Sequence, residues 1–158
     1  MLELIIRNAT LPAGGAAVDI GIAAGRIAEI RPKLEASAPE EIDASGRLVC
    51  PPFVDSHFHM DSTLTYGRPE VNQSGTLLEG IALWGRLKPT LTVDEIHQRA
   101  LAFCRWSTAR GTLAIRSHVD ISDDRLLAVE ALLAVREEMK PWIDLQLVAF
   151  PQDGFLRR

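Results

Sequence analysis

Residues 51–59, PPFVDSHFH, hold the feature on which the fold and the chemistry of this chain both depend. Two prolines open the segment, and Phe53–His59 then reads as a β-strand. Successive side chains of a strand point to opposite faces, so Asp55, His57 and His59 should project together. Two imidazoles on one rigid strand are a natural pair of ligands for Zn²⁺ or Fe²⁺. The alternative is that both histidines are ordinary strand residues.

Two helices are expected after this strand. Thr92–Arg110 is predicted to be helical, because Thr92 and Glu95 fit a capping box and a glycine follows the segment. A second helix is predicted over Ser122–Lys140, with Ser122 as its N-cap and a proline directly after it.

Leu113–His118 and Ile143–Phe150 are predicted strands, and Leu78–Leu87 can form a short helix within an otherwise irregular stretch. Strand, helix, strand, helix, strand is the order of parallel strands joined by crossovers. Three strands do not decide between an open sheet and part of a barrel. The histidine pair ends the first strand, where α/β barrels place their reactive groups.

The first fifty residues are predicted to be strands without a sizeable helix. Leu2–Ile6, Val18–Ile22 and Arg26–Ile30 are apolar and rich in β-branched residues. Residues 23–25, Ala-Ala-Gly, are a plausible hairpin turn between the last two strands. Residues 36–41, rich in Ala, Pro and Glu, are expected to be a loop.

Composition restricts the class of protein. The 158 residues carry a formal net charge of −4, which argues against a general nucleic-acid or membrane-surface binder. Cys50 and Cys104 form no CxxC pair, which favours a reducing compartment. Residues 1–25 lack the pattern of a signal peptide, and no apolar run is long enough to cross a bilayer. A cytoplasmic location without a membrane partner is therefore expected.

Several motifs together resemble one family. DASG and VCPPFVDSHFH, at residues 43–46 and 49–59, resemble the opening of the barrel in the amidohydrolase superfamily, although many members have Gly in place of Pro52. The double proline and three further segments are similar to the cytosine deaminase branch. Those segments are NQSGTL at 72–77, RSHVD at 116–120, and the stretch from PWIDLQ to FPQDG at 141–154. The resemblance covers essentially the whole chain.

The resemblance implies an α/β fold of a particular kind. Family members have a (β/α)₈ barrel and a small β-sandwich built from both chain ends. Residues 1–50 would be the N-terminal share of that sandwich, and residues 51–158 the first three β/α units of an incomplete barrel.

The resemblance also implies a metal site with one divalent ion, Zn²⁺ or Fe²⁺. His57 and His59 match the two metal ligands on the first barrel strand. His118 matches a recurrent residue of the second strand near the site, and Asp55 shares the face of His57; both are candidates for supporting roles outside the ligand set. A hydrogen-bonded core histidine is the alternative for His118.

Substrate contacts are implied for Gln152 and Leu77. Gln152 matches the glutamine that hydrogen-bonds the amide edge of a pyrimidine, and a side-chain amide with two donors and an acceptor suits that role. Leu77 matches the loop that lines the base pocket, with its backbone available for a contact. A solvent-facing loop position is the alternative for Gln152. Trp84, Trp106 and Trp142 are expected to be packing residues.

The implied activity is hydrolytic deamination of cytosine or a related heterocycle by a metal-activated water, with a small-molecule substrate as partner. Isocytosine, creatinine and triazine-type rings are open alternatives. The remaining ligands and the proton-shuttling glutamate come from later strands in the family, so no catalytic residue is assigned within this chain. The chain is then either a fragment or a natural truncation. The alternative function is a non-catalytic chain that forms a homo-oligomer or complements a partner chain, and the intact mass of the native product separates the two.

Overall fold

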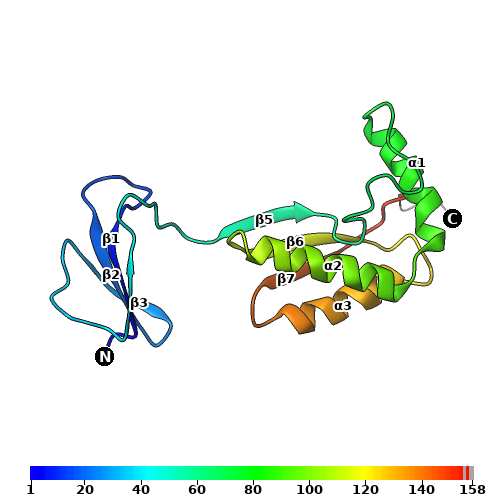
Figure 1. Ribbon diagram of the computed structural model, residues 1–158. Helices are drawn as coiled ribbons and strands as arrows, with labels where there is room; N and C mark the ends of the chain where they lie inside the picture. Colours follow the sequence, from blue (N-terminus) through cyan, green and yellow to red (C-terminus); the bar gives the residue numbers. More distant parts are fainter. Residues whose placement is uncertain (155, 157–158) are drawn as a thin grey trace. The chain divides into compact units, whose positions relative to one another are not determined.

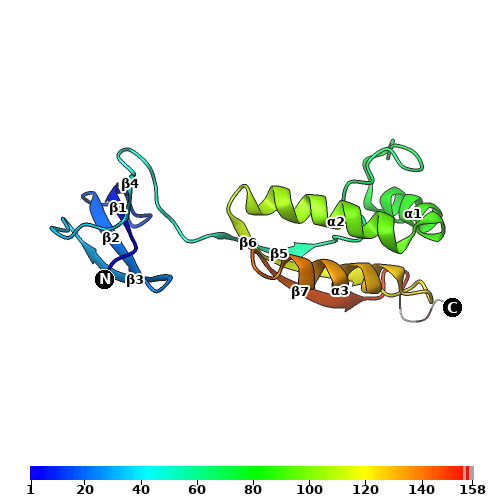
Figure 2. The same ribbon diagram turned by 60° about the horizontal axis from the view of Figure 1, so that its bottom comes forward.

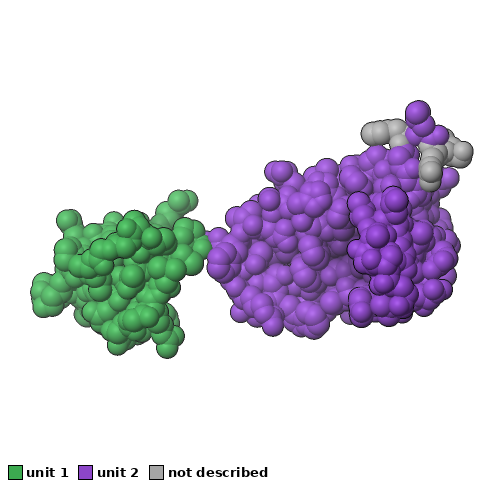
Figure 3. Space-filling view, turned by 90° about the horizontal axis from the view of Figure 1, so that it is seen from above, with its two compact units in different colours: residues 1–51 green, residues 52–158 purple. Residues whose placement is uncertain are grey.

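The computed structural model describes residues 1–154 and 156. The chain divides into two compact units, Met1–Pro51 and Pro52–Arg158 (Figures 1 and 3). Phe155, Arg157 and Arg158, which belong to the predicted barrel segment 51–158, lie outside the described residues. The assignment of the two units to a sandwich and a barrel stays a prediction.

The first unit is a four-stranded sheet in the order β3-β2-β1-β4. β1 (Leu4–Ala9) pairs antiparallel with β2 (Val18–Ala23), which pairs antiparallel with β3 (Arg26–Arg31). The predicted turn between β2 and β3 is confirmed, since Ala24 and Gly25 connect them with positive φ angles of 51° and 68°. Positive φ at both positions matches the type I′ turn that suits a hairpin.

β4 (Glu40–Asp43) corrects the expectation of a loop over residues 36–41. It pairs in parallel with β1, and Glu41 reinforces the pairing because its carboxylate accepts two hydrogen bonds from the guanidinium of Arg7 on β1, 2.9 and 3.0 Å long. The small core of this unit consists of Ala9, Ile20 and Ala44 with partly buried apolar neighbours.

The second unit contains a parallel sheet in the order β5-β6-β7. The strands are β5 (Phe53–Phe58), β6 (Thr112–Asp120) and β7 (Asp144–Phe150). α2 (Val93–Thr108) and α3 (Leu127–Met139) lie side by side against one face of this sheet (Figure 2). α1 (Leu77–Leu87) and the short 3₁₀ helix η1 (Lys88–Thr90) lie between β5 and α2 in the chain. The mixed α/β class and the order of the strands and long helices are as predicted.

A single apolar cluster joins α2 and α3 to the sheet. Buried residues of β6 and β7, including Ile115, Val119 and Leu145, meet Ile96 of α2 and Leu132 of α3. Along β6, alternate residues are buried against the helices, which leaves the intervening side chains, His118 among them, on the opposite face. His118 and the His57 ring that stacks on it therefore lie on the face of the sheet away from α2 and α3.

The two long helices begin differently. Thr92 caps α2 as predicted, because its hydroxyl accepts the backbone N–H of Glu95 at 3.2 Å. The predicted cap at Ser122 is wrong: α3 begins at Leu127, after Leu126 with φ of 52° and no side-chain cap. Ser122 instead accepts the N–H of Asp153 at 3.0 Å, so its hydroxyl is used between segments rather than at a helix end.

No helix within the described part of the chain is both long and apolar enough to pass through a membrane.

Candidate active site

A cavity of about 690 Å³ lies in the second unit. It brings together four of the side chains that the sequence singles out: His57, His59, Leu77 and Gln152. They come from β5 and the residue directly after it, from α1 and from the loop after β7, so the cavity collects residues from segments far apart in the chain. Parallel sheets place binding groups at the carboxyl ends of their strands, which is where His57 and Gln152 lie.

The histidine pair stands at the end of β5. The ring centres of His57 and His59 are 5.4 Å apart. With metal–nitrogen bonds of about 2.0–2.1 Å, two imidazoles on one zinc ion have ring centres roughly 5 Å apart. The spacing and the imidazole nitrogen donors therefore fit a divalent ion between the two rings.

His59 is half-buried beside other imidazoles, and its pKa is lowered. Burial is the largest cause, followed by the neighbouring charges of His57 and His118. A lowered pKa favours the neutral imidazole, which is the form that binds metals.

His118, on β6, stacks on His57 with ring centres 4.1 Å apart and planes 26° apart. Its Nδ1 is buried without a hydrogen-bond partner within the described residues. Across those residues, no three His, Cys, Asp or Glu side chains are placed to hold one ion. Within the described residues, His57 and His59 thus form a pair and His118 a neighbour.

Asp55 lies two residues before His57 on β5. Its carboxylate accepts the backbone N–H of His57 at 3.1 Å. It is not among the described residues that line the cavity. Its contact is therefore with the main chain of the strand that carries the histidine pair.

Leu77 begins α1 and faces the cavity from a tightly closed loop. The hydroxyl of Thr76 accepts the N–H of Glu79, which caps the helix. The carboxylate of Glu79 in turn accepts the N–H groups of Gln73 and Ser74. These bonds explain why the NQSGTL segment holds Leu77 at the start of a helix.

Gln152 follows β7 in a turn. Its N–H donates to the carbonyl of Phe150 at 3.0 Å, and its residue lines the cavity. Phe150 also lines the cavity, and its ring stands at 76° to that of His59 with a centre-to-centre distance of 5.2 Å. An apolar ring and a side-chain amide therefore flank the histidine pair.

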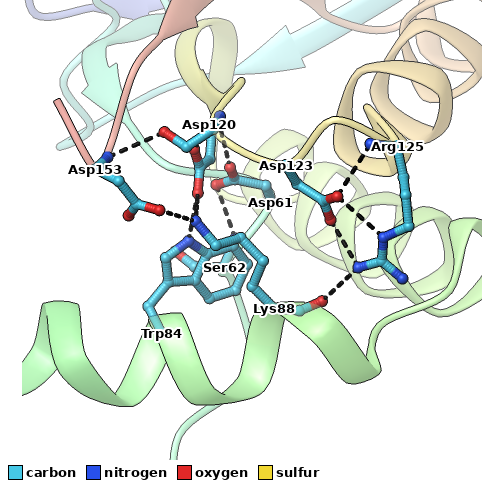
Figure 4. Close-up of polar contacts among 9 residues, drawn as sticks. Asp61, Ser62, Trp84, Lys88, Asp120, Asp123, Arg125 and Asp153 are labelled. Carbon is cyan, nitrogen blue, oxygen red and sulfur yellow. Dashed lines mark hydrogen bonds and ion pairs between the residues drawn. The ribbon is translucent and has the colours of Figure 1, made fainter. Parts of the chain in front are cut away.

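Sequence reasoning missed a polar cluster beside the cavity, shown in Figure 4. Lys88 donates to Asp120 and to Asp153, and Trp84 donates its indole N–H to Asp120 at 2.8 Å. Trp84, expected only to pack, both lines the cavity and makes this bond. The sequence holds two signals for Asp120: it ends the RSHVD segment, and it lies two residues after the predicted strand Leu113–His118.

Asp61 is hydrogen-bonded to the same cluster through the main chain of Asp120. It is buried, and its carboxylate accepts the N–H of Asp120 at 2.7 Å and that of Ser62 at 2.9 Å. Burial raises the pKa of Asp61 to about 6, against the opposing effect of those two hydrogen bonds. The segment that follows the histidine pair is thereby bonded to the end of β6.

Comparison with known proteins places these features in context. A sequence profile described as the Amidohydrolase family matches residues 40–158. The N-isopropylammelide isopropyl amidohydrolase of Pseudomonas sp. (strain ADP) is 39% identical over 97% of this chain and 39% of its own length.

Solved structures of related hydrolases also match this chain in sequence and in fold. The 5-methylcytosine deaminase of Klebsiella pneumoniae, in a complex with 5-fluorocytosine, is 43% identical with a TM-score of 0.87, over 95% of this chain and 37% of its own. The N-isopropylammelide isopropylaminohydrolase of Burkholderia multivorans is 32% identical with a TM-score of 0.79, over 100% of this chain and 40% of its own. The chain thus spans about two fifths of the length of these relatives.

Proposed function

We propose, since this chain belongs to the amidohydrolase family, that it carries one part of the active site of a hydrolase that removes an amino group from cytosine or a related nitrogen heterocycle. The observation that carries the proposal is the cavity that gathers His57, His59, Leu77 and Gln152. The names of the relatives support the substrate class, because one acts on 5-methylcytosine and others on N-isopropylammelide.

His57 and His59 are the residues that would hold a divalent ion, Zn²⁺ or Fe²⁺. Their ring spacing and nitrogen donors fit such an ion, and a catalytic zinc site typically takes three protein ligands plus water, so further ligands come from outside the described residues. When bound, the ion supplies a water of lowered pKa as nucleophile near neutral pH.

The other cavity residues bind and orient the ring. The amide of Gln152 offers two donors and an acceptor, enough to pair with a ring nitrogen and an adjacent carbonyl at once. Leu77 and Phe150 supply apolar walls that exclude water from the ring. Asp55 steadies the strand beneath His57 through its bond to the main chain, and His118 packs against the His57 ring.

The companion predictions of a homo-oligomer and of a cytoplasmic location belong to the same proposal. The alternative of a non-catalytic chain is separated from it by the intact mass of the natural product and by its activity.

The test uses the whole natural protein, purified with its metal. We expect ammonia release from cytosine or 5-methylcytosine, or isopropylamine release from N-isopropylammelide. His57→Ala and His59→Ala should each lower the bound metal and abolish turnover, because each removes one of the paired donors. His97→Ala is the matched control, since His97 lies on α2, where its Nε2 is 3.3 Å from a carboxylate oxygen of Glu138, and it does not line the cavity. Undiminished metal in the double variant would reject the ligand assignment.

A further inference from the structure

Lys88 stands at the junction of α1 and η1 and bridges two carboxylates. Its ammonium lies 2.9 Å from Asp120 at the end of β6 and 2.8 Å from Asp153 in the loop after β7 (Figure 4). The side chains of Lys88 and Asp120 are only 11% and 3% exposed. Removing the cation would leave the buried Asp120 carboxylate without its charged partner, which is strongly destabilising.

One arm of this bridge holds the loop that carries Gln152. Asp153 is the next residue in the chain, and its own N–H donates to the Ser122 hydroxyl at 3.0 Å. Ser122 donates its N–H to Asp120 at 2.8 Å, so the loop after β7 is bonded to the end of β6 through both its main chain and its carboxylate. The main chain that carries Gln152 is therefore restrained at the next residue, Asp153.

The other arm holds the wall of the cavity formed by α1. Trp84 lies one helical turn before Lys88 and donates to the same carboxylate oxygen of Asp120. Trp84 and Leu77 both line the cavity from this helix. Helix α1 and the loop that carries Gln152 are thus both linked to Asp120, the helix through Trp84 and Lys88 and the loop through Lys88.

We propose that Lys88 is a positioning residue that sets the Gln152 amide against the α1 wall of the cavity, at the distance that a planar heterocycle requires. This rests on the proposed function, and it adds a residue that binds no substrate but controls how the ring is recognised. Recognition by a side-chain amide is sensitive to position, because misplacement of a contact by about 1 Å can cost about 100-fold in rate.

The first measurement does not depend on activity. In the whole natural protein, Lys88→Met should accelerate hydrogen exchange of the Gln152 and Asp153 amides by about 10-fold or more, because the bridge restrains the loop. The matched control is Lys140→Met: that lysine is exposed at the end of α3 and pairs only with Glu137 at 3.6 Å among described residues. We expect no change at residues 152–153 in the control.

The second measurement is a kinetic cycle. Lys88→Met should lower kcat/KM by about 10- to 100-fold, mainly through KM, with bound metal unchanged. In the Gln152→Ala background the same substitution should cause little further loss, because the group it positions is already gone. Lys88→Arg should recover part of the loss by restoring a cation at the bridge.

Asp153→Ala serves where Lys88→Met does not fold, since it removes the acceptor that Lys88 contacts in the loop and keeps Lys88 and Trp84 on Asp120. It should loosen the amide of Gln152 while the α1 contacts persist. Unchanged exchange at residues 152–153 together with additive kinetic losses would overturn the proposal. A wild-type protein that hydrolyses no heterocycle refutes the proposed function instead, and the exchange measurement then still decides whether Lys88 restrains the loop.

Discussion

Gln152 reaches the cavity from the turn after β7, with Phe150 beside it. If its amide pairs with the polar edge of a pyrimidine, Gln152→Ala leaves that edge unpaired in a shielded site. We expect kcat/KM to fall by a factor that corresponds to a loss of about 2–4 kcal/mol of transition-state stabilisation, while the bound metal is unchanged. Steady-state kinetics on cytosine and elemental analysis measure the two quantities. The control is Gln98→Ala at an exposed position of α2, and an unaltered kcat/KM for Gln152→Ala would show that Gln152 does not touch the ring.

Asp19 gives the first unit a dependence on pH. The backbone N–H groups of Leu34 and Asn8 donate to its buried carboxylate, and Arg7 pairs with it at 2.9 Å. These bonds outweigh the cost of burial and lower the pKa of Asp19 below its ordinary value. A group with a lowered folded-state pKa stabilises the fold above its unfolded-state pKa of about 3.9, and that contribution is lost as pH falls through the folded-state pKa.

The prediction is therefore that protection of the β1 and β2 amides against hydrogen exchange weakens as pH is lowered from 6 toward 3, after correction for intrinsic exchange rates. Asp19→Asn should lower the protection at pH 6 and flatten its dependence on pH. Glu35→Gln is the control, because Glu35 is exposed and paired only with Lys33 among described residues. An equally steep pH dependence in Asp19→Asn would assign the effect to other carboxylates.

At this scale the sequence can predict pairs on one strand and fails for contacts between elements. His57 lies on β5 and His59 directly follows the end of that strand, so the two-residue spacing of an extended chain predicts that their side chains project together. Lys88, Asp120 and Asp153 belong to three different segments, and only the packing of α1 beside the ends of β6 and β7 brings them together. No local spacing marks such a cluster before the fold is known.

Between elements, the packing of α2 on α3 holds the second unit together. Leu132 of α3 is fully buried in the cluster with α2 and the sheet, whereas its neighbour Leu133 is 41% exposed. Leu132→Ala should lower the free energy of unfolding by about 2–5 kcal/mol, because it removes buried methyl groups and leaves a cavity. Leu133→Ala, the matched control, should cost much less. Urea denaturation followed by tryptophan fluorescence gives both values, and equal losses would contradict the assigned core face.

The helix and strand boundaries show which local rules carry over to the fold. The capping box at Thr92 predicts the start of α2 because its partner, Glu95, is one turn away. The same kind of residue at Ser122 misleads, since its hydroxyl serves Asp153 and α3 starts at Leu127. β4 escapes prediction for a similar reason: its four residues carry no local strand signal, and pairing with β1 and with Arg7 defines it.

At the scale of the molecule, the family resemblance is what the sequence predicts best. It rests on several separate motifs, and the profile match over residues 40–158 and the identity to amidohydrolases confirm it. The remaining metal ligands and the proton-transferring carboxylate could not be predicted from these 158 residues, because the chain spans about two fifths of its relatives. The chemistry of a zinc or iron site predicts which residue types must complete the His57–His59 pair, but not where they lie in the sequence.

A final prediction concerns residues 1–158 purified alone. Within the described residues, β5 and β7 are the edges of the parallel sheet, and Phe53 and Val54 on β5 are 62% and 69% exposed. Unpaired edges with exposed apolar side chains favour pairing with another copy. Within the described residues, the candidate metal site has only the two imidazoles of His57 and His59, whereas a catalytic zinc site typically uses three protein ligands. We therefore expect this chain to self-associate, to bind zinc weakly and to release no ammonia from cytosine.

Light scattering, zinc titration and an ammonia-release assay test these three expectations on chain whose mass is confirmed at 17.4 kDa. Phe53→Lys, placed on the exposed edge strand, should reduce self-association without changing zinc binding, since inward or edge charges block strand pairing. Arg31→Lys on β3 is the control, because it keeps the charge and lies in the first unit. Sustained turnover by a monomer of 17.4 kDa would contradict the argument that the site needs ligands from elsewhere.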